Sequence, residues 1–313
     1  MEMLVTGGGG FIGSNFIRQM FYFHPDYNIT NLDKLTYAVD KKNLDELDSY
    51  PNYFLSVEDI CNVDAVEWLV QHSDIVVHFA AESHVDRSIT GPGEFIRTNV
   101  VGTQVLLDAC VKYKKRFHHI STDEVYGSLS LSDARFTENS PYDPSSPYSA
   151  SKASSDHLVR AYHRTYGLET TITNCSNNYG PWQNEEKFIP RMIKLALEGK
   201  NLQVYGNGLN VRDWIHVYDH CAAIDLVIHK GRIGETYLVG GDEEWPNLFV
   251  AKKIIQITGN DVAIDMVMDR PGHDIRYAID SSKIEEELGW KRTYDFTDGL
   301  IDTVQWYVNR AGK

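Results

Sequence analysis

The stretch LVTGGGGFIG, residues 4–13, decides the fold. Its apolar start predicts a strand, and the amphipathic segment 11–23 that follows predicts a helix. The glycines fit two registers, GxGxxG from Gly8 and GxxGxxG from Gly7, and spacing alone does not choose between them. In either register, bare backbone can approach a pyrophosphate at the amino terminus of the helix. The stretch therefore predicts a dinucleotide-binding turn, with a plain structural glycine turn as the alternative.

An acidic residue after the next strand narrows the choice of ligand. Residues 28–32 read as a strand that ends in Asp33, 20 residues after Gly13. An acidic side chain at this distance accepts hydrogen bonds from the hydroxyls of an adenosine ribose. The negative charge of Asp33 disfavours the 2′-phosphate of NADP. The positive charge of Lys34 beside it keeps NADP as an alternative. These two signals together predict NAD as the cofactor.

Strands and helices continue to alternate through the first half of the chain. Apolar runs predict strands at 53–57, 74–81, 116–120 and 168–173, and helical spacing predicts helices at 63–71, 93–113 and 148–166. This alternation is typical of a Rossmann-type doubly wound parallel sheet, an α/β fold. We expect a Rossmann domain for NAD at 1–174, to which segments near 211–232 return. A smaller α/β C-terminal domain, mostly for substrate binding, is expected over 175–313.

The composition excludes several classes of partner. The 313 residues carry a formal net charge of −14, which argues against nucleic acid or an anionic membrane as a partner. No apolar run approaches the length of a membrane span, and the first residues read as a strand rather than a signal peptide. The 4 cysteines are widely spaced and form no CxxC pair. We therefore expect reduced thiols, no bound metal and a cytoplasmic protein.

The strand at 116–120 ends in the polar run STDE, residues 121–124. Burial of the adjacent carboxylates of Asp123 and Glu124 would be costly, so we expect them in a loop at the carboxyl end of the strand. Ligands bind at that edge of an open parallel sheet. The run thus predicts acid and base groups at a ligand site, with a solvated acidic turn as the alternative.

Tyr148 and Lys152 lie four residues apart, on one face of the predicted helix at 148–166. A nearby ammonium favours the phenolate and lowers the pKa of a tyrosine from its usual value of about 10. Lys152 can also hydrogen-bond the ribose of a nicotinamide cofactor. Beside such a cofactor, the phenolate can deprotonate an alcohol while a hydride leaves its carbon. Without the dinucleotide signals, the pair would be an ordinary surface tyrosine and lysine.

Eight motifs lie along almost the entire chain. They are TGGGGFIGSNF (6–16), NLDKLTYA (31–38), HFAAESHVDRSI (78–89), STDEVYG (121–127), YSASK (148–152), SNNYGP (176–181), VRDWIHV (211–217) and RPGHD (270–274). Together they resemble the extended short-chain dehydrogenase/reductase family and, within it, the nucleotide-sugar 4,6-dehydratases. GxxGxxG and YxxxK specify only the superfamily. The Thr-Asp-Glu of residues 122–124 is more specific, because related epimerases and decarboxylases usually lack the acidic pair.

The resemblance implies a lyase that dehydrates a nucleotide-linked glucose. Tyr148 takes the proton of the 4-hydroxyl, which Thr122 orients, as a hydride passes from C4 to NAD. Glu124 then removes the C5 proton, Asp123 protonates the departing 6-hydroxyl, and the hydride returns to C6. The family implies dTDP-glucose as the substrate and a product for deoxysugar pathways such as that to dTDP-rhamnose. It also implies a homodimer formed through the predicted helices at 93–113 and 148–166.

The resemblance assigns residues to both ligands. Those expected at the cofactor are Gly7, Gly10, Phe11, Ile12, Gly13, Asp33, Lys34, Leu35, Thr36, Asp59, Ile60, Phe79, Ala80, Ala81, Thr98, Tyr148, Lys152 and Asn178. Those expected at the nucleotide sugar are Ser83, Thr122, Asn177, Lys187, Phe188, Ile189, Pro190, Gln203, Tyr205, Arg212, Asn247, Arg270 and His273. Arg212 is expected to bind the diphosphate, and Lys187, Arg270 and His273 to support it.

Three positions depart from the family pattern. Glu58 stands where glycine is usual, Trp182 follows the YGP of residues 179–181 where other residues are usual, and Ile275 replaces a second arginine. None belongs to the acid/base set, but they leave the choice between thymine and uracil open. The rivals are therefore a UDP-glucose 4,6-dehydratase and a nucleotide-sugar C4-epimerase. A non-catalytic dinucleotide-binding regulator is a more remote alternative.

Overall fold

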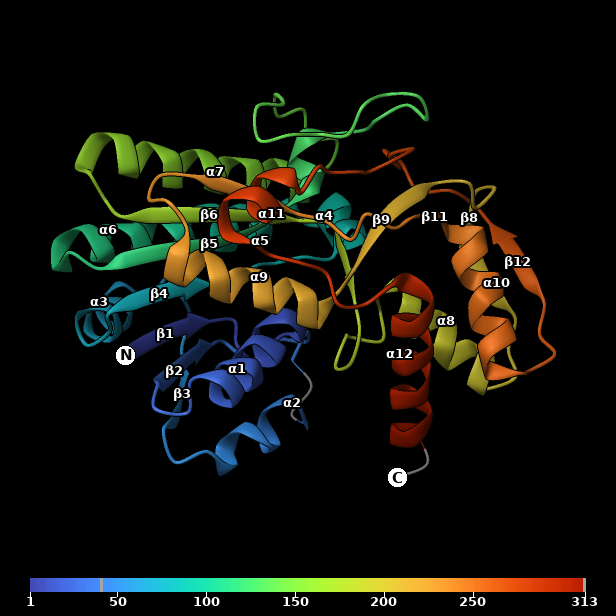
Figure 1. Cartoon of the computed structure of the whole chain (residues 1–313), viewed down its shortest axis with the longest axis horizontal. Helices are drawn as coiled ribbons and strands as arrows, with labels where there is room; N and C mark the ends of the chain where they lie inside the picture. The colour runs from blue at the N-terminus through green and yellow to red at the C-terminus, as the bar shows by residue number, and fades with distance from the viewer. Residues whose placement is uncertain (40–41, 312–313) are drawn as a thin grey trace.

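A parallel sheet forms the centre of the molecule in the computed structural model, which describes residues 1–39 and 42–311 (Figure 1). Its strand order is β10-β6-β5-β4-β1-β2-β3. The strands are β1 (Glu2–Thr6), β2 (Asn28–Asp33), β3 (Tyr53–Val57), β4 (Ile75–His78), β5 (Arg116–Thr122), β6 (Thr170–Cys175) and β10 (Thr236–Val239). All neighbouring strands pair in parallel, so their carboxyl ends meet at one edge. The predicted Rossmann-type sheet is confirmed.

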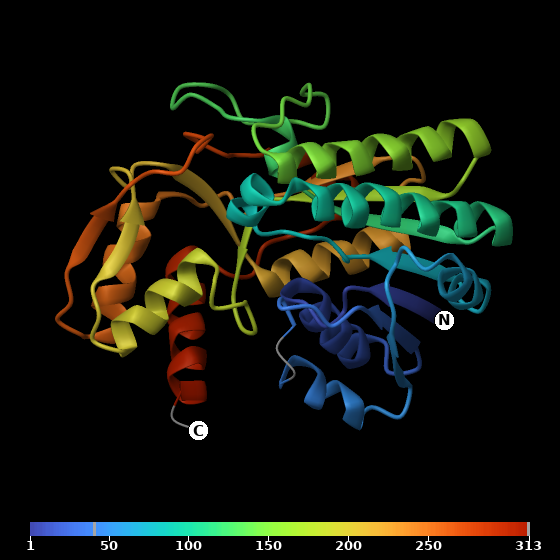
Figure 2. The same ribbon diagram turned by 180° about the vertical axis from the view of Figure 1, so that it is seen from behind.

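Helices cover both faces of this sheet. On the face turned to the viewer in Figure 1 lie α1 (Phe11–Phe23), α9 (Val217–Lys230) and α11 (Ser282–Leu288). On the face seen in Figure 2 lie α3 (Val63–Gln71), α6 (Thr103–Tyr113) and α7 (Pro147–Tyr166). Each face has its own apolar core: Phe16 and Ile17 pack with Ile224 of α9, and Val66 packs with Leu106. The short α2 (Lys42–Asp45) and a 3-10 turn, η1 (Leu47–Ser49), precede β3.

The second half of the chain builds a smaller unit beside the large sheet. Its strands form the sheets β11-β9-β7 and β12-β8. The elements are β7 (Asn177–Tyr179), α8 (Phe188–Leu197), β8 (Leu202–Tyr205), β9 (Val211–His216), β11 (Glu244–Pro246), α10 (Asn247–Thr258), β12 (Ile264–Val267) and α12 (Phe296–Ala311). Between β9 and β11, the chain returns to the large sheet as α9 and β10. The predicted domain boundary near residue 174 stays a prediction.

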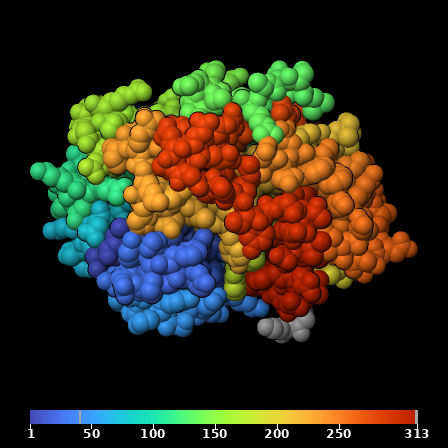
Figure 3. All heavy atoms as spheres, in the orientation of Figure 1, coloured from blue at the N-terminus to red at the C-terminus, as the bar shows by residue number. Residues whose placement is uncertain are grey.

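The C-terminal segments lie across both parts of the molecule. Figure 3 shows them in red, over the helices of the large sheet and against the smaller unit. Asp219 of α9 accepts hydrogen bonds from the backbone N–H groups of Thr293 and Tyr294, which joins this segment to the large sheet. Among the helices of the described part of the chain, none combines the length and apolarity needed to cross a bilayer.

Local sequence explains where α7 begins and ends. The Ser146 hydroxyl accepts the Ser149 N–H at 3.1 Å, and the Ser149 hydroxyl accepts the Ser146 N–H at 3.0 Å, which is a reciprocal cap. Pro147 occupies the first turn, where its missing N–H costs nothing. Gly167 ends the helix with a φ of +68°. The helix predicted at 148–166 is thus confirmed.

The helix predicted at 93–113 is wrong as a continuous α-helix. The structure has α4 (Val85–Thr90), α5 (Pro92–Phe95) and a π-helical turn, η2 (Ile96–Gly102), before α6. The carbonyl of Asn99 in this wider turn accepts hydrogen bonds from Thr103 Oγ1 and Ser155 Oγ, both at 2.6 Å. Its side-chain amide donates to Ser151 Oγ of α7 at 2.8 Å. These side-chain hydrogen bonds compete with the regular α-helical ladder, and such turns are frequent at functional sites.

Candidate active site

A cavity opens where the carboxyl ends of the central strands meet. It is lined by all the residues expected at the cofactor except Leu35. The Leu35 side chain is exposed, and its backbone N–H donates to Asp33 Oδ1 at 2.8 Å. Thr122, Asp123 and Glu124 line the same cavity. The fold therefore brings the predicted dinucleotide site and the predicted acid/base residues together.

The glycine turn is shaped for a phosphate-bearing ligand. Gly7 has a φ of +74°, and a Cβ at this position would lie 2.6 Å from the backbone of Ala80. Gly7, Gly10 and Gly13 line the cavity whereas Gly8 does not, so the register is GxxGxxG. Gly10 is the N-cap of α1, and no side chain caps the helix there. This bare amino terminus fits a pyrophosphate and hence a dinucleotide.

The charges around Asp33 favour NAD over NADP. Asp33 is only 7% exposed, and its Oδ2 accepts the Gly9 N–H at 2.8 Å. Lys34 Nζ lies 3.1 Å from Asp59 Oδ2, which Arg97 also approaches at 3.2 Å. Because Asp59 offsets the charge of Lys34, this lysine is poorly placed to compensate a 2′-phosphate beside Asp33.

The acidic pair is more deeply placed than expected. Asp123 and Glu124 begin a 3-10 turn, η3 (Asp123–Tyr126), at the end of β5. Asp123 is only 1% exposed, so the expectation that both carboxylates avoid burial is wrong. Thr122 Oγ1 donates to Asp123 Oδ1 and accepts the Glu124 N–H, both at 3.2 Å. Within the described residues, Asp123 Oδ2 is buried without a hydrogen-bond partner, which is costly unless the carboxyl is protonated.

The surroundings divide the two carboxyls into an acid and a base. Burial, then the charge of Glu124, raises the pKa of Asp123 well above its usual range. Burial also raises the pKa of Glu124, but three cations oppose that rise; they are Arg270, Arg212 and Lys187. Two neighbouring carboxyls in different surroundings can serve as general acid and general base. Asp123, which is more deeply buried and beside the charge of Glu124, is the better placed of the two to hold a proton.

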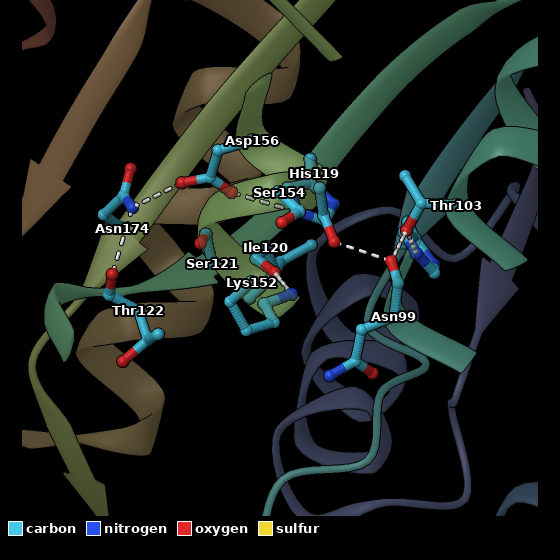
Figure 4. Close-up of polar contacts among 12 residues, drawn as sticks. Asn99, Thr103, His119, Ile120, Ser121, Thr122, Lys152, Ser154, Asp156 and Asn174 are labelled. Carbon is cyan, nitrogen blue, oxygen red and sulfur yellow. Dashed lines mark hydrogen bonds and ion pairs between the residues drawn. The ribbon is translucent and has the colours of Figure 1, made fainter. Parts of the chain in front are cut away.

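The pKa of Tyr148 differs from the prediction. Burial, followed by the charge of Glu124, raises its pKa well above 10, so the predicted lowering is wrong for the ligand-free chain. The ammonium of Lys152 donates to the Ile120 carbonyl at 2.7 Å instead (Figure 4). The neighbouring Thr122 hydroxyl opposes part of this rise in the pKa of Tyr148. It is therefore a protonated phenol that needs additional positive charge nearby before it can act as a base.

A buried carboxylate that the sequence interpretation missed supports Lys152. Asp156 Oδ2 accepts hydrogen bonds from Tyr142 Oη at 2.8 Å and Asn174 Nδ2 at 3.0 Å. Asn174 also donates to the Thr122 carbonyl at 3.0 Å, which ties α7 to the end of β5 (Figure 4). Burial lowers the pKa of Lys152 to about 8, and the charge of Asp156 opposes this lowering. The i,i+4 spacing of Lys152 and Asp156 was the available signal.

Asp156→Asn is expected to move the alkaline limb of the pH–rate profile. Loss of this negative charge lowers the pKa of Lys152 further below 8, so the ammonium is lost at a lower pH. The limb of kcat/KM should shift by about one pH unit toward acid, with KM changed less than kcat. Asp156→Glu should restore part of the profile, and the exposed Asp298→Asn serves as a control. An unshifted limb would show that Asp156 has only a structural role.

A second cavity adjoins the first at Ser83, Glu124, Asn177 and Lys187. The residues expected at the nucleotide sugar line it, with two exceptions. Thr122 lines only the first cavity, and Pro190 is buried in α8 and lines neither. Of the three departures from the family pattern, Glu58 lines the first cavity, whereas Trp182 and Ile275 line neither of these two cavities. Glu124 thus stands at the junction of the two cavities.

The second cavity holds a cation suited to an anionic ligand. Arg212 is 5% exposed, and its guanidinium donates to the carbonyls of Val211 at 2.7 Å and Asp274 at 3.1 Å. In the described part of the chain, no carboxylate lies within ion-pair distance of it. The central carbon of the Arg212 guanidinium lies 4.3 Å from the centroid of the Tyr277 ring. Tyr277 was not identified from the sequence, although it closely follows the RPGHD motif. A desolvated arginine without an acidic partner can bind a diphosphate strongly.

Comparisons with known proteins agree with this geometry. Residues 4–303 match the family model described as GDP-mannose 4,6 dehydratase. The chain is 50% identical to the dTDP-glucose 4,6-dehydratase of Haemophilus influenzae, with 98% of each chain covered. It is 51% identical to the enzyme of that name from Mycobacterium tuberculosis, over 98% of this chain and 93% of the relative.

A solved structure extends the similarity to the fold. DesIV, a dTDP-glucose 4,6-dehydratase from Streptomyces venezuelae solved with NAD bound, superposes with a TM-score of 0.96 at 47% identity, covering 100% of this chain and 98% of DesIV. Identity at this level over nearly the full length of the chain shows the family. The chain belongs to the dTDP-glucose 4,6-dehydratase family.

Proposed function

We propose that this protein is an NAD-dependent lyase that converts dTDP-glucose into dTDP-4-keto-6-deoxyglucose. The reaction comprises oxidation at C4, elimination of water across C5 and C6, and return of the hydride to C6. One observation carries the proposal: the adjacent carboxyls of Asp123, which is buried, and Glu124, which is half-buried, line the dinucleotide cavity, and Glu124 also lines the cation-bearing cavity. An epimerase has no need of such a pair, because epimerisation eliminates nothing from C6.

The residues that act in the first half of the reaction, oxidation at C4, are Tyr148, Thr122 and Lys152. When bound, NAD supplies the hydride acceptor and, in its oxidised form, a positive charge. A positive charge held beside the phenol would lower the pKa of Tyr148 from its raised value in the ligand-free chain. The phenolate oxygen then takes the 4-hydroxyl proton while Thr122 holds that hydroxyl by a hydrogen bond. Asp156 keeps Lys152 charged during this step.

The elimination belongs to the acidic pair. A ketone at C4 acidifies the hydrogen on C5, which the Glu124 carboxylate removes. Asp123, whose pKa is raised by burial and by the charge of Glu124, transfers its proton to the 6-hydroxyl as the C6–O bond breaks. Water leaves, and a C5=C6 double bond forms. The two steps use one base and one acid from adjacent residues.

The nucleotide end of the substrate lies in the second cavity in this proposal. Arg212 forms charge-assisted hydrogen bonds with the diphosphate, and Lys187, Arg270 and His273 line the same cavity. Thymine is the proposed base. Its test is a panel of dTDP-, UDP-, CDP- and GDP-glucose, followed by the appearance of the 4-keto-6-deoxy product. Highest kcat/KM with dTDP-glucose is expected, whereas a higher value with UDP-glucose would assign the protein to a different substrate.

We further propose a homodimer in the cytoplasm. Support for the dimer comes from α7, which exposes the small residues Ala150, Ser154 and Ala161, and from the exposed apolar side chains of Ile96 and Val101 nearby. Light scattering should give twice the mass of one chain, and a monomer mass would reject the dimer. The 4 cysteines are all unpaired thiols, which supports a reducing compartment.

A further inference from the structure

A cluster of metal-ligating side chains lies away from both cavities. His24 follows α1 directly, and Asp225 and His229 lie one turn apart near the end of α9. Because α1 follows β1 and α9 leads into β10, both helices run back along the large sheet, and their carboxyl ends lie at the edge opposite the cavities. The proposed dehydration uses none of these three residues.

The three side chains converge on one point. His24 Nε2 lies 3.1 Å from Asp225 Oδ1, and His229 Nδ1 lies 2.8 Å from the same oxygen. One ligand atom from each residue falls within 4.8 Å of the other two. In a tetrahedral zinc site with bonds of about 2.0–2.1 Å, ligand atoms are separated by about 3.3 Å. The two histidine–carboxylate distances are already close to this separation, whereas the His24 and His229 nitrogens, which lie within 4.8 Å of each other, would have to approach one another to hold a cation.

We propose that His24, Asp225 and His229 form a binding site for Zn²⁺ that joins α1 to α9. Two imidazoles and one carboxylate suit zinc and related transition metals, whereas Mg²⁺ and Ca²⁺ take oxygen ligands. The side chains are 27%, 21% and 27% exposed, so solvent reaches the site and can fill a fourth position. This proposal departs from the expectation of no metal, which rested on the cysteine spacing, because it needs no cysteine.

A neighbouring tyrosine orients the ligands. Tyr27 Oη lies 2.8 Å from His229 Nε2. His229 Nδ1 also lies 2.8 Å from the backbone carbonyl oxygen of Asp225, so metal binding requires Nδ1 to lose its proton while Nε2 donates to the tyrosine. The Tyr27 ring also stacks on His24, with centroids 4.6 Å apart and planes 7° from parallel. Metal-ligating histidines are usually fixed by such a contact at the second nitrogen.

The surrounding charges permit a cation. The positive charge of Arg116 acts on His229, but its guanidinium donates to the Ile228 carbonyl at 2.8 Å and lies 3.8 Å from Glu169. The Asp225 carboxylate supplies negative charge inside the cluster. Without metal, the same three residues form a hydrogen-bonded clasp between segments separated by 201 residues. Zinc would replace these hydrogen bonds by coordinate bonds.

Zinc binding to the tag-free, chelator-treated full-length chain tests the site. Calorimetry should give one tight Zn²⁺ per chain, and at 100-fold excess over Kd the Tm should rise by about 5 °C, with no change for Mg²⁺. His24→Gln and His229→Gln should each weaken binding by at least about 100-fold. His72→Gln, which replaces an exposed histidine at the end of α3, is the matched control and should bind as the unaltered chain does.

Two outcomes would overturn the proposal. One is the absence of a stoichiometric Zn²⁺ on the unaltered chain, and the other is unchanged affinity in both variants. Circular dichroism and dehydratase activity without added metal check that the variants are folded. If His229→Gln does not fold, Asp225→Asn replaces it in the same titration. Because the site lies away from both cavities, this test is independent of the proposed reaction.

Discussion

Tyr148→Phe is expected to lower the rate of C4 oxidation by about 10³-fold or more. The substitution removes the oxygen that accepts the 4-hydroxyl proton and keeps the ring, and general-base groups contribute about 10² to 10⁴ to a rate. The buried ring still meets Phe95, whose centroid lies 6.3 Å away, so the fold should be retained. NADH absorbance in a single turnover measures this step. Product formation should fall by at least the same factor, because elimination requires the ketone.

Tyr126→Phe is the matched control for this loss. Tyr126 is also buried, in the same 3-10 turn as the acidic pair, but its ring stacks on Phe136 at 5.2 Å instead of contacting Thr122. Its variant should oxidise C4 at nearly the rate of the unaltered chain. If Tyr148→Phe oxidises C4 at a rate within tenfold of that of the unaltered chain, Tyr148 is not the base.

Glu124→Gln is expected to separate oxidation from elimination. The amide is nearly isosteric but cannot accept the C5 proton, so elimination should fall by about 10³-fold. Oxidation should persist, because the charge of Glu124 raises the pKa of Tyr148 and its removal lowers that pKa. NADH should therefore accumulate during a single turnover. Absorbance and product analysis on the same sample distinguish the two steps.

Glu58→Gln provides the comparison for this variant. Glu58 lines the dinucleotide cavity but not the second cavity, so its loss should leave elimination intact. If Glu124→Gln loses oxidation and elimination to the same extent, Glu124 is not the C5 base. The assignment of acid and base to the pair would then have to be reversed or abandoned.

The sequence predicted the elements with strong patterns. The helices at 11–23 and 63–71 and the strand at 53–57 have the predicted bounds, because each carries a clear apolar period between turn residues. Strands such as β7 and β11 have only three residues, which is too short for a periodic signal. The return of β10 to the large sheet depends on pairing with β6, which no local pattern encodes.

The sequence predicted which residues lie together at the site better than it predicted their burial and pKa values. Motif spacing brought Thr122, Glu124 and Tyr148 to one edge of the sheet, since parallel strands align their carboxyl ends. Burial of Asp123 and the raised pKa of Tyr148 depend on three-dimensional packing around that edge, which sequence patterns do not encode. The cluster of His24, Asp225 and His229 joins segments 201 residues apart, which sequence spacing cannot reveal.

The most direct test of the central claim is turnover of dTDP-glucose in deuterium oxide. If Tyr148, Glu124 and Asp123 perform oxidation and elimination in one site, the 4-keto-6-deoxy product must carry solvent deuterium at C5. The methyl group at C6 must carry the hydrogen that came from C4. A sugar epimerised at C4, without deuterium at C5 and with its 6-hydroxyl retained, would contradict the account.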